Sequence, residues 1–344
     1  MRLFKHLLRA SLICCLLLIN LADLVLASKG TPNSATFGYG AAVNMQENPA
    51  EQTIQVAKQL ALDWLTVPIN WQEIQPESTS SPDWSSIQSI IHEAAKNQIS
   101  IMIQIKNVPA WAFTSTGPDA SKTADFVEAL AAQFWPSIQA VEIFPGANTL
   151  AGWGGKPDAV AYLSVIQLVK QQLHQKNCSL YLVVGGLVPS PREGIPAADF
   201  LTQLYKSGLS EVSDVLSVQY LVSADTHNIA GNNRTAIFDW IEEIHQIMLL
   251  NGHTNGVIWI THLEDPSGTI TISGQEILQF CRQFRSRLYI GTLFFGNLDL
   301  REPPTPDYAP TESCVNDEPD FSSLTAIVRE LIFENNGGCS TVGT

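Results

Sequence analysis

The sequence predicts a single-domain α/β protein, a closed (β/α)8 TIM barrel. Short apolar, β-branched runs alternate with amphipathic stretches along most of the chain, which is typical of parallel strands joined by helices. Apolar residues make up 45% of the 344 residues and charged residues 15%, so the chain can bury a large core and is not a disordered protein. The first apolar run, at Phe37-Gly38-Tyr39-Gly40, lacks the GxGxxG spacing typical of the alternative, a doubly wound sheet.

Eight strands and eight helices are expected in alternation. The expected strands cover residues 36–43, 63–69, 100–106, 139–144, 179–186, 214–220, 256–262 and 287–295. The expected helices cover residues 49–60, 83–97, 120–135, 157–176, 195–207, 234–250, 273–286 and 319–334. Within 83–97, Ile87, Ile90, Ile91 and Ala94 have the i, i+3, i+4, i+7 spacing of one helix face. The loops after the strands are longer than those after the helices, which places the expected ligand face at the carboxyl ends of the strands.

The N-terminus has the pattern of a secretory signal peptide. Three basic residues precede an apolar run over 10–27, and small or modest residues lead to an expected cleavage after Ala27. A retained membrane anchor is the alternative, but Asp23 inside the run is costly in hydrocarbon. The expected organisation is a signal peptide at 1–27, a short linker at 28–35 and the barrel at 36–344. The protein is therefore expected to be secreted or extracytoplasmic, and no later stretch is long and apolar enough to span a bilayer.

Charge and cysteine content restrict the partners. The 33 acidic and 19 basic residues give a net charge of -14, which repels phosphate backbones and argues against nucleic acid. Outside the signal peptide no CxxC spacing occurs, so no zinc site is expected, and no motif indicates another metal or a cofactor. Cys314 and Cys339 lie in loop-like sequence and are the expected disulfide, whereas Cys178 and Cys281 are expected to be buried thiols.

Several segments share an order and spacing with one family. The second expected strand leads into the pattern W-x-x-x-x-x-x-W-x-x-I-x-P, beginning at Trp64, and the third ends in Pro109-Ala110-Trp111. The fourth reads Val141-Glu142-Ile143 and is followed by Asn148, Trp153, Asp158 and Tyr162. Over residues 36–335 the chain thereby resembles the clan-A glycoside hydrolases, the retaining (β/α)8 glycosidases related to cellulases and β-xylosidases.

The resemblance implies hydrolysis of O-glycosyl bonds by two carboxylates, roughly 5–5.5 Å apart in retaining enzymes. It places the acid/base after the fourth strand and the nucleophile at the end of the seventh. Those positions read Gly146 and His262 here, and Pro145 stands where an Asn would bind the sugar. Both catalytic Glu positions are thus replaced. Glu142, inside the fourth strand, is expected to be a buried, hydrogen-bonded acid.

Three functions are compatible with these replacements. The first is an exported, catalytically degenerate homologue that binds a glycan or oligosaccharide. The second is an active O-glycosyl hydrolase that uses a displaced carboxylate such as Glu264, two residues beyond His262. The third is a non-enzymatic extracellular interaction protein. The oligomeric state stays open.

A glycan site at the barrel mouth would use aromatic rings, which stack on sugar rings, and polar side chains beside them. The same aromatic residues are as well suited to packing in the core. The candidates for substrate binding are Trp71, Trp111, Asn148, Trp153, Gln219, Tyr220 and Phe295.

Overall fold

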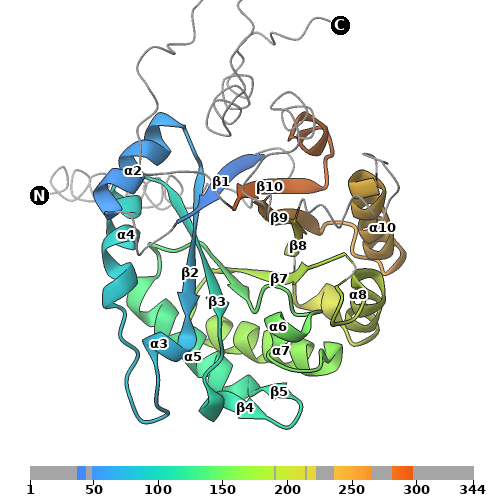
Figure 1. Ribbon diagram of the computed structural model, residues 1–344, viewed down its shortest axis with the longest axis horizontal. Coiled ribbons are helices and arrows are strands. Elements are labelled where there is room, and N and C mark those ends of the chain that lie inside the picture. Colours follow the sequence, from blue (N-terminus) through green and yellow to red (C-terminus); the bar gives the residue numbers. More distant parts are fainter. Residues whose placement is uncertain are drawn as a thin grey trace, which may run out of the picture.

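The computed structural model describes residues 37–43, 49–189, 191–213, 215–221, 236–264 and 281–296. Eight parallel strands close into a barrel in the order β1-β10-β9-β8-β7-β6-β3-β2 (Figure 1). The strands are β1 Gly38–Ala42, β2 Trp64–Asn70, β3 Ser100–Lys106, β6 Ala140–Ile143, β7 Tyr181–Leu187, β8 Val215–Leu221, β9 Val257–Glu264 and β10 Ile290–Phe295. The predicted (β/α)8 barrel is confirmed, and each of its strands falls within or close to an expected range.

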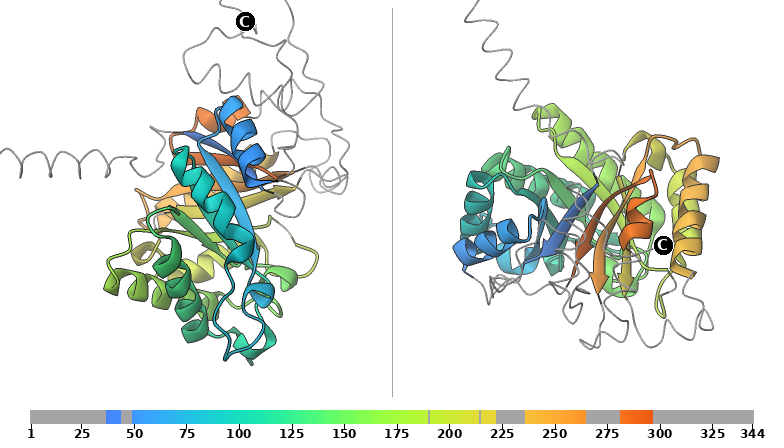
Figure 2. Two further views of the ribbon diagram at one scale, coloured as in Figure 1. Left: turned by 90° about the vertical axis from the view of Figure 1, so that its left-hand side faces the viewer. Right: turned by 90° about the horizontal axis from the view of Figure 1, so that it is seen from above.

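The helices lie outside the strands, as the view from above shows (Figure 2). The longer helices are α2 Ala50–Gln59, α4 Ser85–Lys96, α5 Ala120–Phe134, α7 Ala159–Gln175, α8 Ala197–Lys206 and α10 Ala236–Leu250. Of the expected helix at 273–286, only the end from residue 281 is described, and the one at 319–334 lies outside the described residues. The same holds for the signal peptide, the linker, Cys314 and Cys339. Within the described residues, every helix is too short or too polar to cross a membrane.

Short elements in the loops after strands were not expected. In the loop after β3, β4 Phe113–Thr114 pairs antiparallel with β5 Gly117–Pro118. Two single-turn helices, α3 Trp71–Ile74 and α6 Leu150–Trp153, follow β2 and β6. Elements of two to four residues are too short for a hydrophobic period to be read, which is why the sequence did not reveal them.

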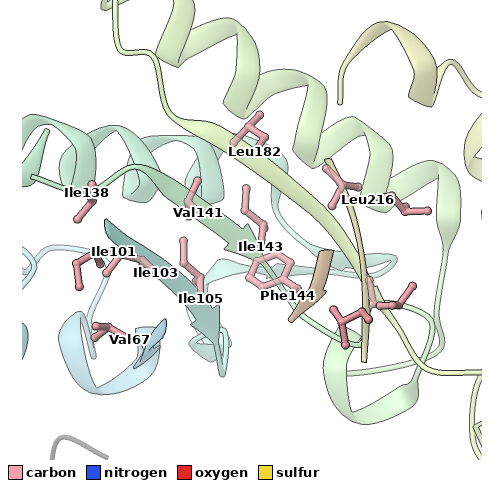
Figure 3. Close-up of a cluster of buried hydrophobic side chains, with 14 of the residues drawn as sticks. Val67, Ile101, Ile103, Ile105, Ile138, Val141, Ile143, Phe144, Leu182 and Leu216 are labelled. Atoms are coloured by element: carbon pink, nitrogen blue, oxygen red, sulfur yellow. The ribbon is translucent and has the colours of Figure 1, made fainter. Parts of the chain in front are cut away.

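Alternation along each strand divides the core into two parts. One set of side chains, including Ile103, Ile105, Val141 and Ile143, belongs to the large hydrophobic cluster that includes helix residues (Figure 3). The other set points into the barrel. Away from the carboxyl ends of the strands, these interior side chains form a smaller cluster made of Trp64, Met102, Ala140, Val183, Val215, Val257, Trp259 and Phe294. Closer to the carboxyl ends the interior becomes polar, with buried Gln104, Glu142, Ser217 and Thr261.

Candidate functional site

The segment after β6 is packed, backbone to backbone, on an irregularity in β7. The register between β7 and β8 shifts between Val184 and Leu187, which marks a bulge at the two intervening glycines. The buried Gly146 has φ +81° and donates its N–H to the Gly186 carbonyl at 2.9 Å. A Cβ on Gly186 would lie only 2.7 Å from Pro145 Cα. The position that corresponds to the acid/base in the resemblance is therefore a tight backbone contact.

Asn148 uses its side chain to hold loops together. Its amide nitrogen donates to the carbonyls of Val188 and Ile195, each at 2.8 Å, and its oxygen accepts from the Val188 N–H at 3.0 Å. The residue is fully buried. These bonds occupy both amide hydrogens, so in this structure Asn148 connects the loops after β6 and β7.

His262 faces the barrel interior at the end of β9. It pairs with Gln219 on β8 after a register shift, and paired residues of parallel strands point to the same side. A Cβ on Gly296, just after β10, would lie 2.4 Å from the His262 ring, so the imidazole covers that glycine. An imidazole cannot form the glycosyl ester of a retaining glycosidase. Glu264 is the last residue of β9 and pairs with Leu221.

Glu142 is the buried, hydrogen-bonded barrel acid that the sequence predicted. Its side chain is inaccessible to solvent and accepts from Thr261 Oγ1 at 2.8 Å and from Gln104 Nε2 at 2.6 Å. Burial raises the pKa of the Glu142 carboxyl, and hydrogen bonds from Ser217, Thr261 and Gln104 and the charge of Lys106 oppose this shift. The carboxyl group thus joins β6 to β3, β8 and β9.

Ser217 extends this network to the segment after β6. Its hydroxyl bonds Glu142 and accepts the Gly186 N–H at 2.6 Å. The Gly186 carbonyl in turn accepts from Gly146. A continuous set of hydrogen bonds therefore runs from the barrel interior to the backbone of Gly146.

Three of the aromatic candidates lie in the core. Trp71 is stacked on Phe126, with ring centroids 4.6 Å apart, and its indole N–H donates to Gln75 Oε1. Trp153 donates to the Thr116 carbonyl of the β4–β5 hairpin, and its ring lies against Gly117. Phe295 is fully buried.

Trp111 and Gln219 are the candidates that keep partial exposure among the described side chains. Trp111 contacts Trp71 edge to face, with ring centroids 5.7 Å apart. The Lys122 ammonium lies 5.7 Å from the centroid of the Trp111 ring. Gln219 lies beside His262 on the neighbouring strand. Tyr220 follows it and pairs with Leu263. The structure therefore brings Gln219 and His262 side by side at the mouth, whereas the Tyr220 side chain lies outside the described part of the structure.

Sequence reasoning did not select Lys106 and Asn70, which end β3 and β2 and pair with each other. Both are partly exposed, and Asn70 donates to Glu73 Oε1 at 2.7 Å. Lys106 has the strand parity of Met102 and Gln104, which point into the barrel. That parity was the signal available in the sequence. Within the described residues, no group of three metal-ligating side chains is present.

Comparison with known proteins connects this geometry to glycosidases through fold alone. No family model and no curated protein matches the sequence. A family 39 glycoside hydrolase from Bacteroides cellulosilyticus WH2 has a TM-score of 0.58 at 14% identity, covering 79% of this chain and 59% of that one. An endo-β-1,4-glucanase from Xanthomonas axonopodis pv. citri has a TM-score of 0.56 at 14% identity, covering 86% and 99%. A conserved exported protein from Bacteroides fragilis has a TM-score of 0.54 at 12% identity, covering 76% and 69%.

This chain thus spans 59% of the length of the family 39 enzyme, less than two thirds. The neighbours that are glycoside hydrolases bear out the resemblance at the level of the (β/α)8 fold. At 12–14% identity they carry no information on substrate or activity.

Proposed function

We propose that this protein, a barrel with the fold of glycoside hydrolases, is an exported glycan-binding homologue that does not hydrolyse glycosides by the retaining mechanism. One observation carries the proposal. The strand ends that would hold the two catalytic carboxylates carry Gly146, engaged through its backbone, and His262.

The chemical consequence is large. A positioned acid/base contributes roughly 10²–10⁴-fold to the rate. Without a carboxylate nucleophile, the covalent glycosyl-enzyme intermediate cannot form. Among the barrel-facing strand residues whose side chains are described, Glu142 is the one carboxyl, and it is enclosed by Gln104, Thr261 and Ser217. It has no accessible oxygen with which to attack an anomeric carbon.

Binding needs different groups from catalysis, so it can persist when catalysis is lost. Trp111 and Gln219 keep exposure near the strand ends and are the retained candidates for glycan contact. Trp111→Ala is expected to weaken glycan binding without lowering the unfolding midpoint much. Trp71→Ala, by contrast, is expected to lower the midpoint because this side chain is fully buried.

The test is a panel of aryl glycosides together with a glycan array, both applied to the purified protein. We expect binding on the array and no turnover above the buffer rate. Hydrolysis abolished by Glu264→Gln, but not by the control Glu51→Gln on the exposed side of α2, would establish the displaced-carboxylate enzyme instead. Absence of both binding and turnover would favour the interaction protein.

Export is tested separately. The charged start and apolar run over 10–27 support cleavage, and one structural neighbour is an exported protein. N-terminal sequencing of the secreted protein is expected to begin at Ser28. Recovery of the chain from Met1 in the membrane fraction would show a retained anchor.

A further inference from the structure

The mouth of the barrel carries donors and a cation at four described strand ends. Asn70 ends β2, Lys106 ends β3, and Gln219 on β8 pairs with His262 on β9. All four side chains are partly exposed, and none of them is acidic. Glu73, on α3 just after β2, is engaged by the Asn70 amide.

Lys106 is the permanent charge of this set, and its position is defined by its strand. Gln104, two residues earlier, reaches the carboxyl group of Glu142 inside the barrel. Since alternate residues share a face, Lys106 lies on the same face one step closer to the mouth. Its ammonium acts on the Glu142 carboxyl by charge alone. No ion pair or hydrogen bond of Lys106 occurs within the described part of the chain.

The replaced catalytic positions change what this mouth can accept. Two carboxylates at the ends of β6 and β9 would repel a negatively charged sugar placed between them. With Gly146 and His262 there, that repulsion is gone, while the Lys106 ammonium is present. Among the barrel-facing strand side chains that the structure describes, the one acid is Glu142, which already receives three hydrogen bonds and has no surface to present to a ligand.

We propose that the mouth of the barrel binds a carboxylate-bearing sugar, a uronic acid unit of a glycan, with Lys106 as its anchor. This inference rests on the proposed function, since it names the class of glycan. An ammonium and a carboxylate form a charge-assisted hydrogen bond, which is stronger than a bond between neutral groups. The whole chain has a net charge of -14, so an anionic glycan is attracted only by a local cation such as this one.

The experiment compares matched ligands by isothermal titration calorimetry on the full chain. Each neutral β-1,4-linked oligosaccharide of glucose, mannose or galactose is paired with its C6-oxidised uronate, which differs only in the carboxylate. The variants are Lys106→Gln, Lys106→Arg and the control Lys96→Gln, whose lysine is exposed on α4 and paired with Glu93. Circular dichroism confirms that each variant is folded.

We expect one uronate to bind at least about tenfold more tightly than its neutral partner. Lys106→Gln is expected to weaken uronate binding roughly 10- to 100-fold and to leave the neutral ligand unchanged. Lys106→Arg should retain most of the affinity, and Lys96→Gln should have no effect.

Two other results would overturn the inference while the proposed function stands. One is equal or tighter binding of the neutral partner, and the other is uronate binding that survives Lys106→Gln. Failure of every oligosaccharide, neutral and oxidised, to bind would instead remove the proposed function itself.

Discussion

Individual glycines determine the local geometry of the mouth. Gly146 adopts a left-handed φ of +81°, where a side chain costs about 1–2 kcal/mol. A Cβ there would meet Thr149 Oγ1 at 3.4 Å, which is ordinary contact, so backbone conformation and not space is the constraint. Gly186, with φ +52°, has both constraints, because a Cβ would also collide with Pro145. The triple variant Gly146→Glu, Pro145→Asn and His262→Glu is therefore not expected to hydrolyse glycosides.

Gly146→Ala tests the backbone constraint. We expect the free energy of unfolding in urea to fall by about 1–2 kcal/mol, because alanine must adopt the left-handed region. The matched control is Gly155→Ala in the same loop, where a Cβ would meet nothing within 4 Å and φ is not left-handed. The control should stay within about 0.5 kcal/mol of the unsubstituted protein. Equal losses of unfolding free energy in the two variants would show that the left-handed backbone of Gly146 is not the constraint.

Among the elements, α7 secures the junction between β6 and β7. Asp158 caps this helix by accepting from the N–H groups of Val160 and Ala161. The first turn then presents Tyr162, whose hydroxyl donates to the Ile143 carbonyl at 3.0 Å and accepts from the Gly185 N–H at 2.9 Å. A single buried hydroxyl thereby connects the end of one strand to the bulge of the next.

Tyr162→Phe is expected to reduce the free energy of unfolding by about 1–3 kcal/mol, since it leaves two buried backbone groups unsatisfied. Tyr181→Phe at the start of β7 is the control, because its hydroxyl has no hydrogen-bond partner in the described residues and is partly exposed. Chemical denaturation of both variants measures the difference. A loss at Tyr181 as large as that at Tyr162 would show that the bridge between the strands contributes nothing.

At the scale of the whole molecule, Glu142 connects four of the eight strands through the barrel interior. Burial raises its pKa above the ordinary 4.5 in the folded state. The folded protein therefore binds this proton more tightly than the unfolded chain does. The resulting stabilisation is complete below about pH 4.5 and is lost as the pH rises through the folded pKa.

Glu142→Gln removes this titration. We expect the variant to become more stable relative to the unsubstituted protein as the pH rises from about 4 to about 8. Urea unfolding across that range measures the difference between the two free energies of unfolding. Glu142→Ala should instead lose about 3 kcal/mol throughout, because it leaves the donors of Gln104, Thr261 and Ser217 without an acceptor. The exposed Glu51→Gln serves as the control. If the free energies of unfolding of Glu142→Gln and the unsubstituted protein changed in parallel with pH, the pKa of Glu142 would not be raised in the folded state.

The sequence by itself determined the barrel, since strand and helix periods are local properties that each segment carries alone. Strand parity also predicted that Glu142 is buried. Through the resemblance to glycoside hydrolases, the sequence predicts that Gly146 and His262 stand at the two catalytic positions. Only the tertiary structure decided which candidate side chains meet solvent. Trp71, Trp153 and Asn148 lie in segments that lead to the mouth, yet each is enclosed by partners from other segments. The position of Lys106 above Glu142 likewise depends on β3 and β6 lying side by side, because burial and charge are set by neighbours that are distant along the chain.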